Sequence, residues 1–597
     1  MGQYPANILK TICIRAGVIT AFFVCAMPLA FAQDKSKQAD VIVTNGRIYT
    51  VNAKQPWAEA IAISNHQIVA VGTVADVERW RGPRTQMIDA QKHVVLPGFY
   101  DSHIHFMEGA LSLEKVNVDE TKTVGEIQEK VKAFAAAHPK DAWVLGRGWS
   151  YPEFPGGMPD KKYLDEIIPD RPVYIEGFDG HTGWANSKAL QLSGISKSTT
   201  NPPNGEIVRD PKTGEATGAL KEDAANIVVR HLPVPTTAER AAALKKAIAW
   251  ANSVGLARVV GCGNDTTATS DYLFMDLLRQ MQKRGELTLR FANSYYVSPE
   301  GLSATDWKTI AAYRQRFPAN DDWLSFDAAK FFLDGVIESH TAAMLAPYSD
   351  DPKQIGSMRW DVERYRQTVQ ALDKAGIQIY THAIGDKAVR TALDAYEAAA
   401  KANGTNDARH RIEHIETISP QDIPRFGSLG VIASFQPLHA YPDEDTLDVW
   451  LKNVGEERGT RAWTWQSISR AGGRLAFGSD WPVVTLNPWY GVQNAVTRQT
   501  RDGKPPGGFV PQERISLQQA IEGYTLGAAI GARKEKTEGS LEPGKLADLI
   551  ILSQDLFSME PSQIYKTNVL LTMVGGKVVY ESPEFRPSTK ISAKGNQ

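Results

Sequence analysis

The chain has 597 residues, of which 42% are hydrophobic and 22% charged, as in an ordinary globular protein. That length suits a large barrel with a satellite domain, or roughly two to four domains on length alone. The formal net charge is -2 and no basic stripe alternates with aromatic residues, which argues against nucleic acid or an anionic membrane as a partner.

The first residues carry the pattern of a secretory signal. Lys10 and Arg15 precede an apolar run, 16–32, that ends in Ala-Phe-Ala before a polar stretch. A basic region, an apolar region and an Ala-x-Ala end predict a cleavable signal peptide at 1–32. The alternative is an uncleaved anchor, since the run is only slightly shorter than a membrane span. The Ala-x-Ala end favours cleavage, so we expect a periplasmic or secreted protein with no stable membrane anchor.

Cysteine usage gives no disulfide in the mature chain. Cys13 and Cys25 leave with the predicted signal, and bulky residues before Cys25 argue against a lipid anchor. Cys262, the one remaining thiol, ends an apolar strand-like run. A buried structural thiol is favoured over a nucleophile, because no Cys-His signature surrounds it.

Both ends of the mature chain predict β-structure. Asn45-Gly46 lies between two β-branched runs, which indicates a hairpin. Further short strands are predicted on both sides of the chain, at 60–63, 67–72, 93–96, 548–552 and 569–580. We therefore expect one small β-sandwich assembled from 40–97 and 536–585.

The middle of the chain, 98–535, alternates helical and strand-like stretches. Predicted helices cover 237–253, 363–375 and 386–402, and apolar strand-like runs follow each of them. Such β–α alternation predicts a parallel sheet of the α/β class, and this length suits a (β/α)₈ TIM barrel. The segment 143–225, rich in Pro, Gly, Trp and Tyr, breaks the alternation and indicates an insertion after the first strand.

A His-x-His pair lies at the end of the first predicted barrel strand. On a strand, the i, i+2 spacing of His103 and His105 puts both imidazoles on one face. Neutral imidazole is a ligand for zinc and similar metals. The alternative is a pair of strand-end histidines on a wet face, and the pair alone does not decide between them.

Other ligand-type residues recur at the ends of later strands. His382, His414 and Asp480 each close an apolar run. The carboxyl ends of barrel strands are where the active sites of TIM barrels are built. This recurrence predicts a metal centre at that end of the barrel.

The set resembles the amidohydrolase superfamily and, more narrowly, the amidohydrolase type 3 family, which includes N-substituted formamide deformylases. The motifs that carry the resemblance span about 40–580 and are Leu96–His105, Asp179–Leu190, Gly218–Glu222, Lys330–Gly335, Ser434–His439, Gly478–Val483 and Gly539–Asp548. His340 stands where an arginine is expected in this family.

The resemblance implies a site for one or two divalent metal ions, with Zn²⁺ as the default. It implies that His103, His105 and Asp480 hold one ion and that His382 and His414 hold a second. Lys330 would bridge them as a carbamate, which requires a neutral amine. The alternative for Lys330 is a packed stem with an ion-paired amine.

Further residues are candidates for substrate binding. His181 and His439 fall in motifs of the family outside the ligand set, and each adjoins a turn after a strand. Trp149, Tyr151 and Trp184 lie in the predicted insertion and could line an apolar pocket, although aromatic residues more often belong to a core.

Together these features predict a hydrolase that uses metal-activated water to cleave a non-peptide C–N bond in a small molecule, namely an amide, an N-substituted formamide or a cyclic amide. Asp480 is the expected general base. The alternatives are a deaminase or ester-cleaving relative, and a binding or regulatory protein that retains the fold without turnover. The sequence leaves a homodimer open.

Overall fold

The computed structural model describes residues 38–119, 121–263, 274–404 and 407–585. The predicted signal peptide therefore lies outside the described residues. Among those that are described, no helix is both long enough and apolar enough to cross a membrane.

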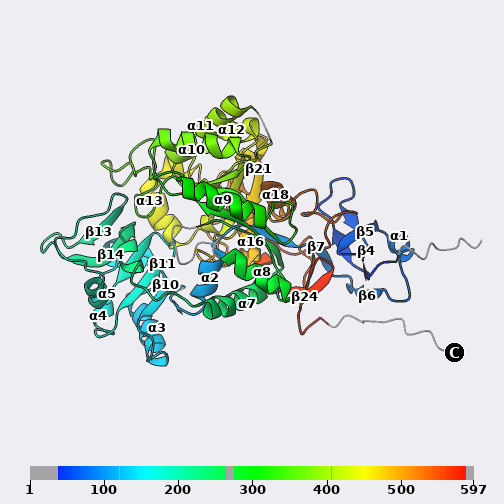
Figure 1. The fold of residues 1–597 in the computed structure, drawn as a ribbon, viewed down its shortest axis with the longest axis horizontal. Helices are drawn as coiled ribbons and strands as arrows, with labels where there is room; N and C mark the ends of the chain where they lie inside the picture. The colour runs from blue at the N-terminus through cyan, green and yellow to red at the C-terminus, as the bar shows by residue number, and fades with distance from the viewer. Residues whose placement is uncertain (1–37, 120, 264–273, 405–406, 586–597) are drawn as a thin grey trace, which may run out of the picture. The chain divides into compact units, whose positions relative to one another are not determined.

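The central part of the chain forms a nearly closed barrel of eight parallel strands, which confirms the predicted TIM barrel (Figure 1). In the order in which they neighbour one another, the strands are β8 (Phe99–Ile104), β15 (Leu256–Gly261), β16 (Arg290–Tyr296), β17 (Leu324–Phe332), β18 (Gln378–Ala383), β19 (Arg411–His414), β20 (Ile432–Phe435) and β21 (Arg474–Phe477). Beyond the end of β21, Asp480 N–H donates to His103 O at 2.7 Å, which joins the last strand to the first.

Helices cover the outside of the barrel and are α2 (Phe106–Ser112), α7 (Thr237–Ser253), α8 (Met275–Lys283), α9 (Ala304–Arg316), α10 (Val362–Lys374), α11 (Asp386–Asn403), α12 (Ile423–Leu429), α15 (Trp465–Arg470), α16 (Pro488–Thr497), α17 (Leu517–Gly523) and α18 (Leu526–Gly531). Local sequence defines their ends. α7 begins after a capping box of Thr236 and Glu239. Gly376, at φ 73°, lets the chain turn from α10 into β18.

The two ends of the described chain form a second, β-rich unit of two sheets. The four-stranded sheet has the order β5 (Gln67–Gly72), β4 (Ala60–Ser64), β1 (Val41–Thr44) and β6 (Gln86–Asp89). The six-stranded sheet has the order β24 (Lys577–Glu581), β23 (Val569–Val574), β22 (Leu549–Leu552), β7 (Val94–Pro97), β2 (Arg47–Tyr49) and β3 (Trp57–Ala58). β7 pairs with β2 on one side and with β22 on the other, so strands from both termini share one sheet.

A single apolar cluster fills the space between the two sheets. It includes Val43 and Ile63 from the N-terminal part and Ile551 and Met573 from the C-terminal part. Burying these side chains removes apolar surface that neither half could cover alone. The predicted β-sandwich assembled from both termini is therefore present (Figure 1).

The predicted hairpin at Asn45-Gly46 is wrong. Asn45 does adopt a left-handed conformation, with φ 55°. However, β1 pairs with β4 and β6, whereas β2 pairs with β3 and β7 in the other sheet. The turn carries the chain from one layer of the sandwich to the other, because in this arrangement Val43 of β1 and Ile48 of β2 both enter the apolar cluster between the sheets.

Two buried ion pairs join the sandwich side to the barrel. Arg258 of β15 binds both carboxylate oxygens of Glu538 at 2.8 and 2.7 Å. Arg290 of β16 binds Asp548 in the same two-pronged manner at 2.8 and 3.0 Å. Bidentate guanidinium–carboxylate contacts are directional as well as charged. They fix the end of the barrel opposite the predicted metal centre.

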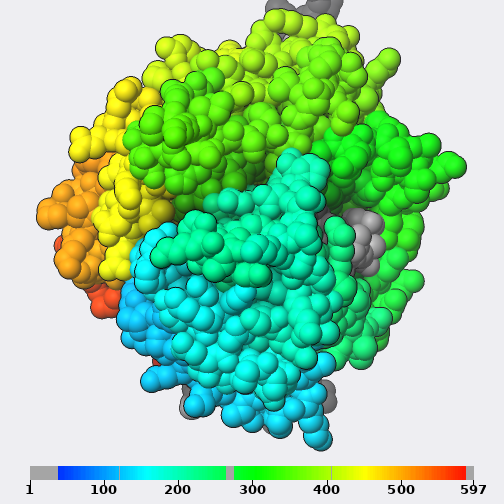
Figure 2. All heavy atoms as spheres, turned by 90° about the vertical axis from the view of Figure 1, so that its left-hand side faces the viewer, coloured from blue at the N-terminus to red at the C-terminus, as the bar shows by residue number. Residues whose placement is uncertain are grey.

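A separate six-stranded sheet is inserted between β8 and β15. Its order is β13 (Gly205–Arg209), β14 (Ala216–Glu222), β12 (Thr182–Ala185), β11 (Val173–Gly177), β10 (Val144–Trp149) and β9 (Val116–Asn117), with α3 (Val124–Ala137) and α5 (Ser187–Leu192) packed against it. The inserted structure therefore starts before residue 143. Figure 2 shows this segment, coloured cyan to blue-green, on the face toward the viewer.

Contacts with loops at the carboxyl ends of the barrel strands hold the inserted sheet in place. Ser150 donates to Asp445 at 2.8 Å, and the Arg147 guanidinium donates to the carbonyl oxygen of Pro482. The inserted sheet therefore covers the end of the barrel that carries the predicted ligands.

Candidate metal centre

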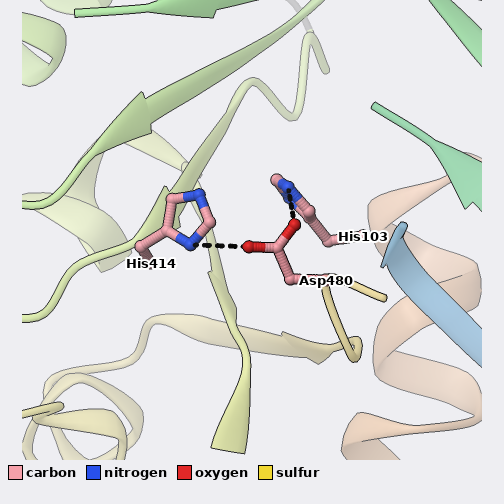
Figure 3. A group of neighbouring side chains, drawn as sticks. All are labelled: His103, His414 and Asp480. Carbon is pink, nitrogen blue, oxygen red and sulfur yellow. Dashed lines mark ion pairs between the residues drawn. The ribbon is translucent and has the colours of Figure 1, made fainter. Parts of the chain in front are cut away.

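Three predicted histidine ligands meet around the carboxylate of Asp480, which is itself a predicted ligand. Asp480 Oδ1 lies 3.3 Å from Nε2 of His103 and 3.2 Å from Nε2 of His105. Asp480 Oδ2 lies 3.9 Å from Nδ1 of His414. Figure 3 shows the carboxylate of Asp480 between the imidazoles of His103 and His414. One donor atom from each of these three residues lies within 4.8 Å of the other two, which is close enough for a common ion.

The barrel strands bring these residues together from distant parts of the sequence. His103 and His414 are at the carboxyl ends of β8 and β19, and Asp480 follows β21. Asp480 and His414 have left-handed backbones, with φ 63° and 75°. Such conformations cost of order 1–3 kcal/mol in a residue other than glycine and cluster at functional sites.

Asp101 fixes the backbone beneath the cluster. Its Oδ1 accepts from the N–H of Ser479 at 2.9 Å and from the N–H of His103 at 3.2 Å. Its Oδ2 accepts from the Ser479 hydroxyl. A single buried carboxylate thereby holds β8 and the segment that carries Asp480 at a fixed separation.

Several buried polar atoms of the cluster have no hydrogen-bond partner among the described residues: His414 Nδ1, His439 Nε2 and Asp480 Oδ1. The contacts of Asp480 Oδ1 with the two imidazoles lack hydrogen-bond geometry. An unsatisfied buried polar atom costs about 1–3 kcal/mol, so a convergent group of them calls for a partner. Imidazole nitrogens and a carboxylate oxygen are the donor set of a divalent metal such as zinc. The residues present fit a metal ion.

Other buried groups orient two of the imidazoles. Glu413 accepts from His103 Nδ1 at 2.7 Å, which leaves Nε2 of that ring directed at Asp480. His382 Nε2 lies 3.2 Å from the carbonyl oxygen of Gly335 and 3.5 Å from Asp334, so its other nitrogen, Nδ1, is the one available to a metal. Metal-binding histidines in proteins commonly have such partners on the nitrogen that does not bind the metal.

The protonation of His382, His414 and Asp480 suits metal binding. Burial lowers the pKa of His382 and that of His414 well below the ordinary value, so both rings are held neutral. Burial alone would raise the pKa of Asp480, but the facing His103 and His105 hold that pKa well below its usual range. Asp480 is therefore an anion surrounded by nitrogen donors.

Lys330 lies inside the same cluster. Its side chain is fully buried on β17, with Nζ 3.3 Å from His103 Nε2 and 4.5 Å from the centre of the Phe332 ring. No carboxylate of a described residue forms an ion pair with it, so the expected alternative of an ion-paired amine does not hold. Cys262 is buried close by, with its sulfur within 4.8 Å of His103 and of Glu413, and forms no disulfide.

Two further histidines surround the cluster. His439 Nε2 lies 3.6 Å from Asp480 Oδ2, and its ring stacks on that of His414 with centroids 5.8 Å apart. His181, from the inserted sheet, has its ring centroid 5.7 Å from that of His382. The side chains of His105, His181 and His439 are 12%, 14% and 11% exposed. These three are therefore more accessible to solvent than the buried His103, His382 and His414.

The three predicted pocket aromatics do not line an open pocket. Trp149 and Trp184 are wholly buried in the apolar core of the inserted sheet, together with Tyr151. The Tyr151 hydroxyl donates to Asp179 at 2.7 Å. That expectation is corrected, because a sheet that stands apart from the barrel needs a core of its own and these large side chains supply it.

His340 does not belong to the metal centre. Its Nε2 faces the carboxylate of Asp350 at 2.9 Å, and its backbone is left-handed, with φ 60°. The replacement of the arginine expected in the family therefore leaves the ligand cluster unchanged.

Sequence reasoning missed the carboxylates that support the histidines, namely Asp101, Glu413, Asp334 and Glu222. Asp101, Asp334 and Glu222 lie in motifs that carry the family resemblance, and Glu413 directly precedes His414. The available signal was an acidic residue in an otherwise apolar strand, which rarely stays buried without a partner. The identity of that partner depends on the fold.

Comparisons with known proteins agree with this geometry. A family model described as the amidohydrolase family matches residues 86–580. The chain is 34% identical over 551 residues to Protein LONG AFTER FAR-RED 3 of Arabidopsis thaliana, covering 91% of this chain and 92% of that protein. It is 26% identical over 556 residues to an N-substituted formamide deformylase of Arthrobacter pascens, covering 92% of this chain and 99% of that enzyme.

A crystal structure of an uncharacterized metal-dependent hydrolase from Pyrococcus horikoshii superposes with a TM-score of 0.68 at 25% identity, covering 87% of this chain and 99% of that one. Fold and site thus define a metal-dependent hydrolase built on a TIM barrel. The chain belongs to the amidohydrolase family.

Proposed function

We propose that the protein hydrolyses a non-peptide C–N bond of a small molecule, in an amide, an N-substituted formamide or a cyclic amide. The observation that carries the proposal is the Asp480 carboxylate, set against Nε2 of His103 and Nε2 of His105 at the carboxyl end of the barrel. The similarity to an N-substituted formamide deformylase over nearly the whole chain supports this bond type.

His103, His105 and Asp480 would hold one divalent ion, and His382 and His414 a second. A bound divalent ion lowers the pKa of water toward neutrality and polarises a carbonyl group. The nitrogen-rich donor set favours Zn²⁺, and iron, manganese and nickel suit the same ligand types.

Asp480 is the proposed general base. Its carboxylate is ionised, buried and adjacent to the position that the imidazoles define. It takes a proton from the attacking water and passes it to the leaving nitrogen, so that the C–N bond breaks and an amine departs. Glu413 keeps the His103 ring in the orientation that this arrangement needs.

Lys330 is the proposed bridge between two ions, as a carbamate. The support is its position, because the amine is buried against His103 and no carboxylate of a described residue neutralises it. Burying an uncompensated ammonium is costly, and conversion to a carbamate would replace it with an anion that bound divalent ions would neutralise. We also propose that the mature protein is exported to the periplasm or secreted, on the strength of residues 1–32.

The test is turnover by the metal-loaded mature protein on a panel of N-substituted formamides, N-acyl amino acids and alkyl esters, with the chelator-treated protein as the matched control. Hydrolysis of a formamide or an amide that is lost on chelation and restored by metal supports the proposal. Turnover of esters alone would point to the ester-cleaving alternative for the same site. Metal binding without turnover would point to a non-catalytic role.

A further inference from the structure

His181 is the histidine that the inserted sheet brings to the metal centre. It lies in the loop between β11 and β12, where Asp179 Oδ1 accepts its backbone N–H at 2.9 Å. Its Nδ1 lies 3.1 and 3.0 Å from the two carboxylate oxygens of Glu222. A ring nitrogen that donates to a carboxylate fixes both the tautomer and the orientation of the imidazole.

The other nitrogen of that ring is free to meet a substrate. His181 Nε2 makes no hydrogen bond to another residue in the part of the chain that the structure describes. The side chain is 14% exposed and its ring lies against that of His382. Because Nδ1 and Nε2 lie on different sides of the ring, the Glu222 contact leaves Nε2 as the atom that faces an incoming molecule.

Glu222 is itself held in place by both the inserted sheet and the barrel. It ends β14 of the inserted sheet and has a left-handed backbone, with φ 49°. Thr341 and Arg359, both from the segment between β17 and α10, donate to its carboxylate at 2.7 and 3.3 Å. The position of the carboxylate is therefore set jointly by the inserted sheet and by the barrel.

A purely structural role for Glu222 would be to tie the inserted sheet to the barrel. The neighbouring residue Asp223 also connects the inserted sheet to the barrel, since Arg359 donates to its carboxylate at 2.9 Å. Unlike Asp223, Glu222 is nearly buried and uses both oxygens on a histidine at the metal centre. The two neighbouring carboxylates thus allow the structural tie and the orientation of His181 to be separated by experiment.

We propose that Glu222 is a positioning residue, which fixes the His181 imidazole so that Nε2 forms a hydrogen bond with the polar group of the substrate that undergoes hydrolysis. This inference rests on the proposed function. Glu222 does not touch the substrate and acts only through His181. The pKa values agree with an ion pair: burial opposes both charges, but His181 lowers the pKa of Glu222 to about 2 and Glu222 raises the pKa of His181 to about 9.

The test is a double-mutant cycle measured on the metal-loaded protein, with Glu222→Ala, His181→Ala and the double variant. Glu222→Ala should lower kcat by about 10–100-fold, as loss of a histidine-orienting partner does, with metal content unchanged. KM should stay within about threefold, because the lost contact matters most as charge develops. Adding Glu222→Ala to His181→Ala should have no further effect, because Glu222 acts only through His181.

Two other variants separate positioning from folding. Glu222→Gln keeps an oxygen that accepts from Nδ1–H and should restore most of the kcat lost in Glu222→Ala. Asp223→Asn weakens the neighbouring tie through Arg359 and should leave kcat unchanged. Independent, multiplicative losses in the double variant would overturn the inference. So would an equal loss of kcat in Asp223→Asn.

A crystal structure of metal-loaded Glu222→Ala, or of Glu222→Gln if the first variant does not fold, provides a readout without turnover. The His181 ring should leave its position in Glu222→Ala and keep it in Glu222→Gln, with His382 and His414 in place in both. An unmoved ring in Glu222→Ala, or a displaced ring in Glu222→Gln, would overturn the inference. Absence of turnover by the wild type on the amide panel would instead refute the proposed function and leave this structural readout intact.

Discussion

Replacing Glu413 by glutamine should weaken the metal centre without replacing any of the proposed metal ligands. The carboxylate accepts from His103 Nδ1 at 2.7 Å and from the Arg411 guanidinium at 2.8 and 3.0 Å, and none of its surface is exposed. Hydrogen bonds to charged groups contribute about 1.5–3 kcal/mol, against about 1 kcal/mol for neutral ones. Glu413→Gln should therefore lower metal affinity by about 10–100-fold, the usual effect of losing a histidine-orienting carboxylate.

The same change should reduce stability, because the buried Arg411 loses its counter-charge. Removing one partner of a buried pair costs about 3–5 kcal/mol, and the amide oxygen of glutamine should keep the loss near the lower end. The assay combines metal retention during dialysis against graded chelator with urea unfolding of the chelated protein. Glu535→Gln is the matched control, since Glu535 pairs with Arg409 at 2.7 Å with 22% of its side chain exposed. Its cost should be at most about 1 kcal/mol, with metal affinity unchanged.

Acid unfolding provides a second test of the interactions of Glu413. Burial alone would raise the pKa of Glu413, but Arg411 and His103 lower it from 4.5 to about 2. A carboxyl group whose pKa is lower in the folded than in the unfolded protein stabilises the fold at any pH above its unfolded-state pKa. That contribution is lost as the pH falls toward the folded-state pKa. The wild type should thus lose stability between about pH 4.5 and 2 more steeply than Glu413→Gln.

The result that would refute the orienting role of Glu413 is a metal affinity of Glu413→Gln within about twofold of the wild-type affinity.

Three other predictions concern the remaining parts of the account. Glu538→Ala should destabilise the protein by about 3–5 kcal/mol in urea unfolding, because Arg258 is left buried without its partner, and a loss below about 1 kcal/mol would contradict the role of this pair. Crystals of the metal-loaded protein should show a carboxyl group on Lys330 Nζ together with two metals, whereas a bare amine beside a single metal would rule out the bridge. N-terminal sequencing of exported protein should start at Gln33, and a start at Met1 in a membrane fraction would refute cleavage after Ala32.

Much of the architecture could be predicted because it follows from local pattern. The Ala-rich stretch 237–253 predicts a helix without reference to the rest of the fold, and α7 covers those residues. The His-x-His spacing predicts two rings on one side of a strand end, and both Nε2 atoms do reach Asp480, His103 from β8 and His105 from the N-cap of α2 that follows it. Repeated strand-end ligands could be assigned to one end of a barrel, because parallel strands share that end.

The parts that could not be predicted depend on contacts between distant segments. The turn at Asn45-Gly46 has the local chemistry of a hairpin, yet β1 and β2 join different sheets because their apolar partners lie elsewhere. Trp149 and Trp184 carry no signal that separates a domain core from a pocket wall.

The supporting carboxylates show the same limit. Glu413 meets His103 across 310 positions of sequence, and Glu222 meets His181 across 41. An acidic residue in an apolar motif signals that a partner exists, but only the packed structure identifies it.

Metal content and kcat, measured side by side on Asp480→Asn and His103→Ala, test the central claim most directly. Asparagine keeps an oxygen that can bind metal but cannot accept a proton at neutral pH. Asp480→Asn should therefore retain most of the metal while kcat falls by about 10²–10⁴, the usual contribution of a positioned acid–base group. His103→Ala should lose metal and activity together. Near-normal turnover in Asp480→Asn would contradict the mechanism.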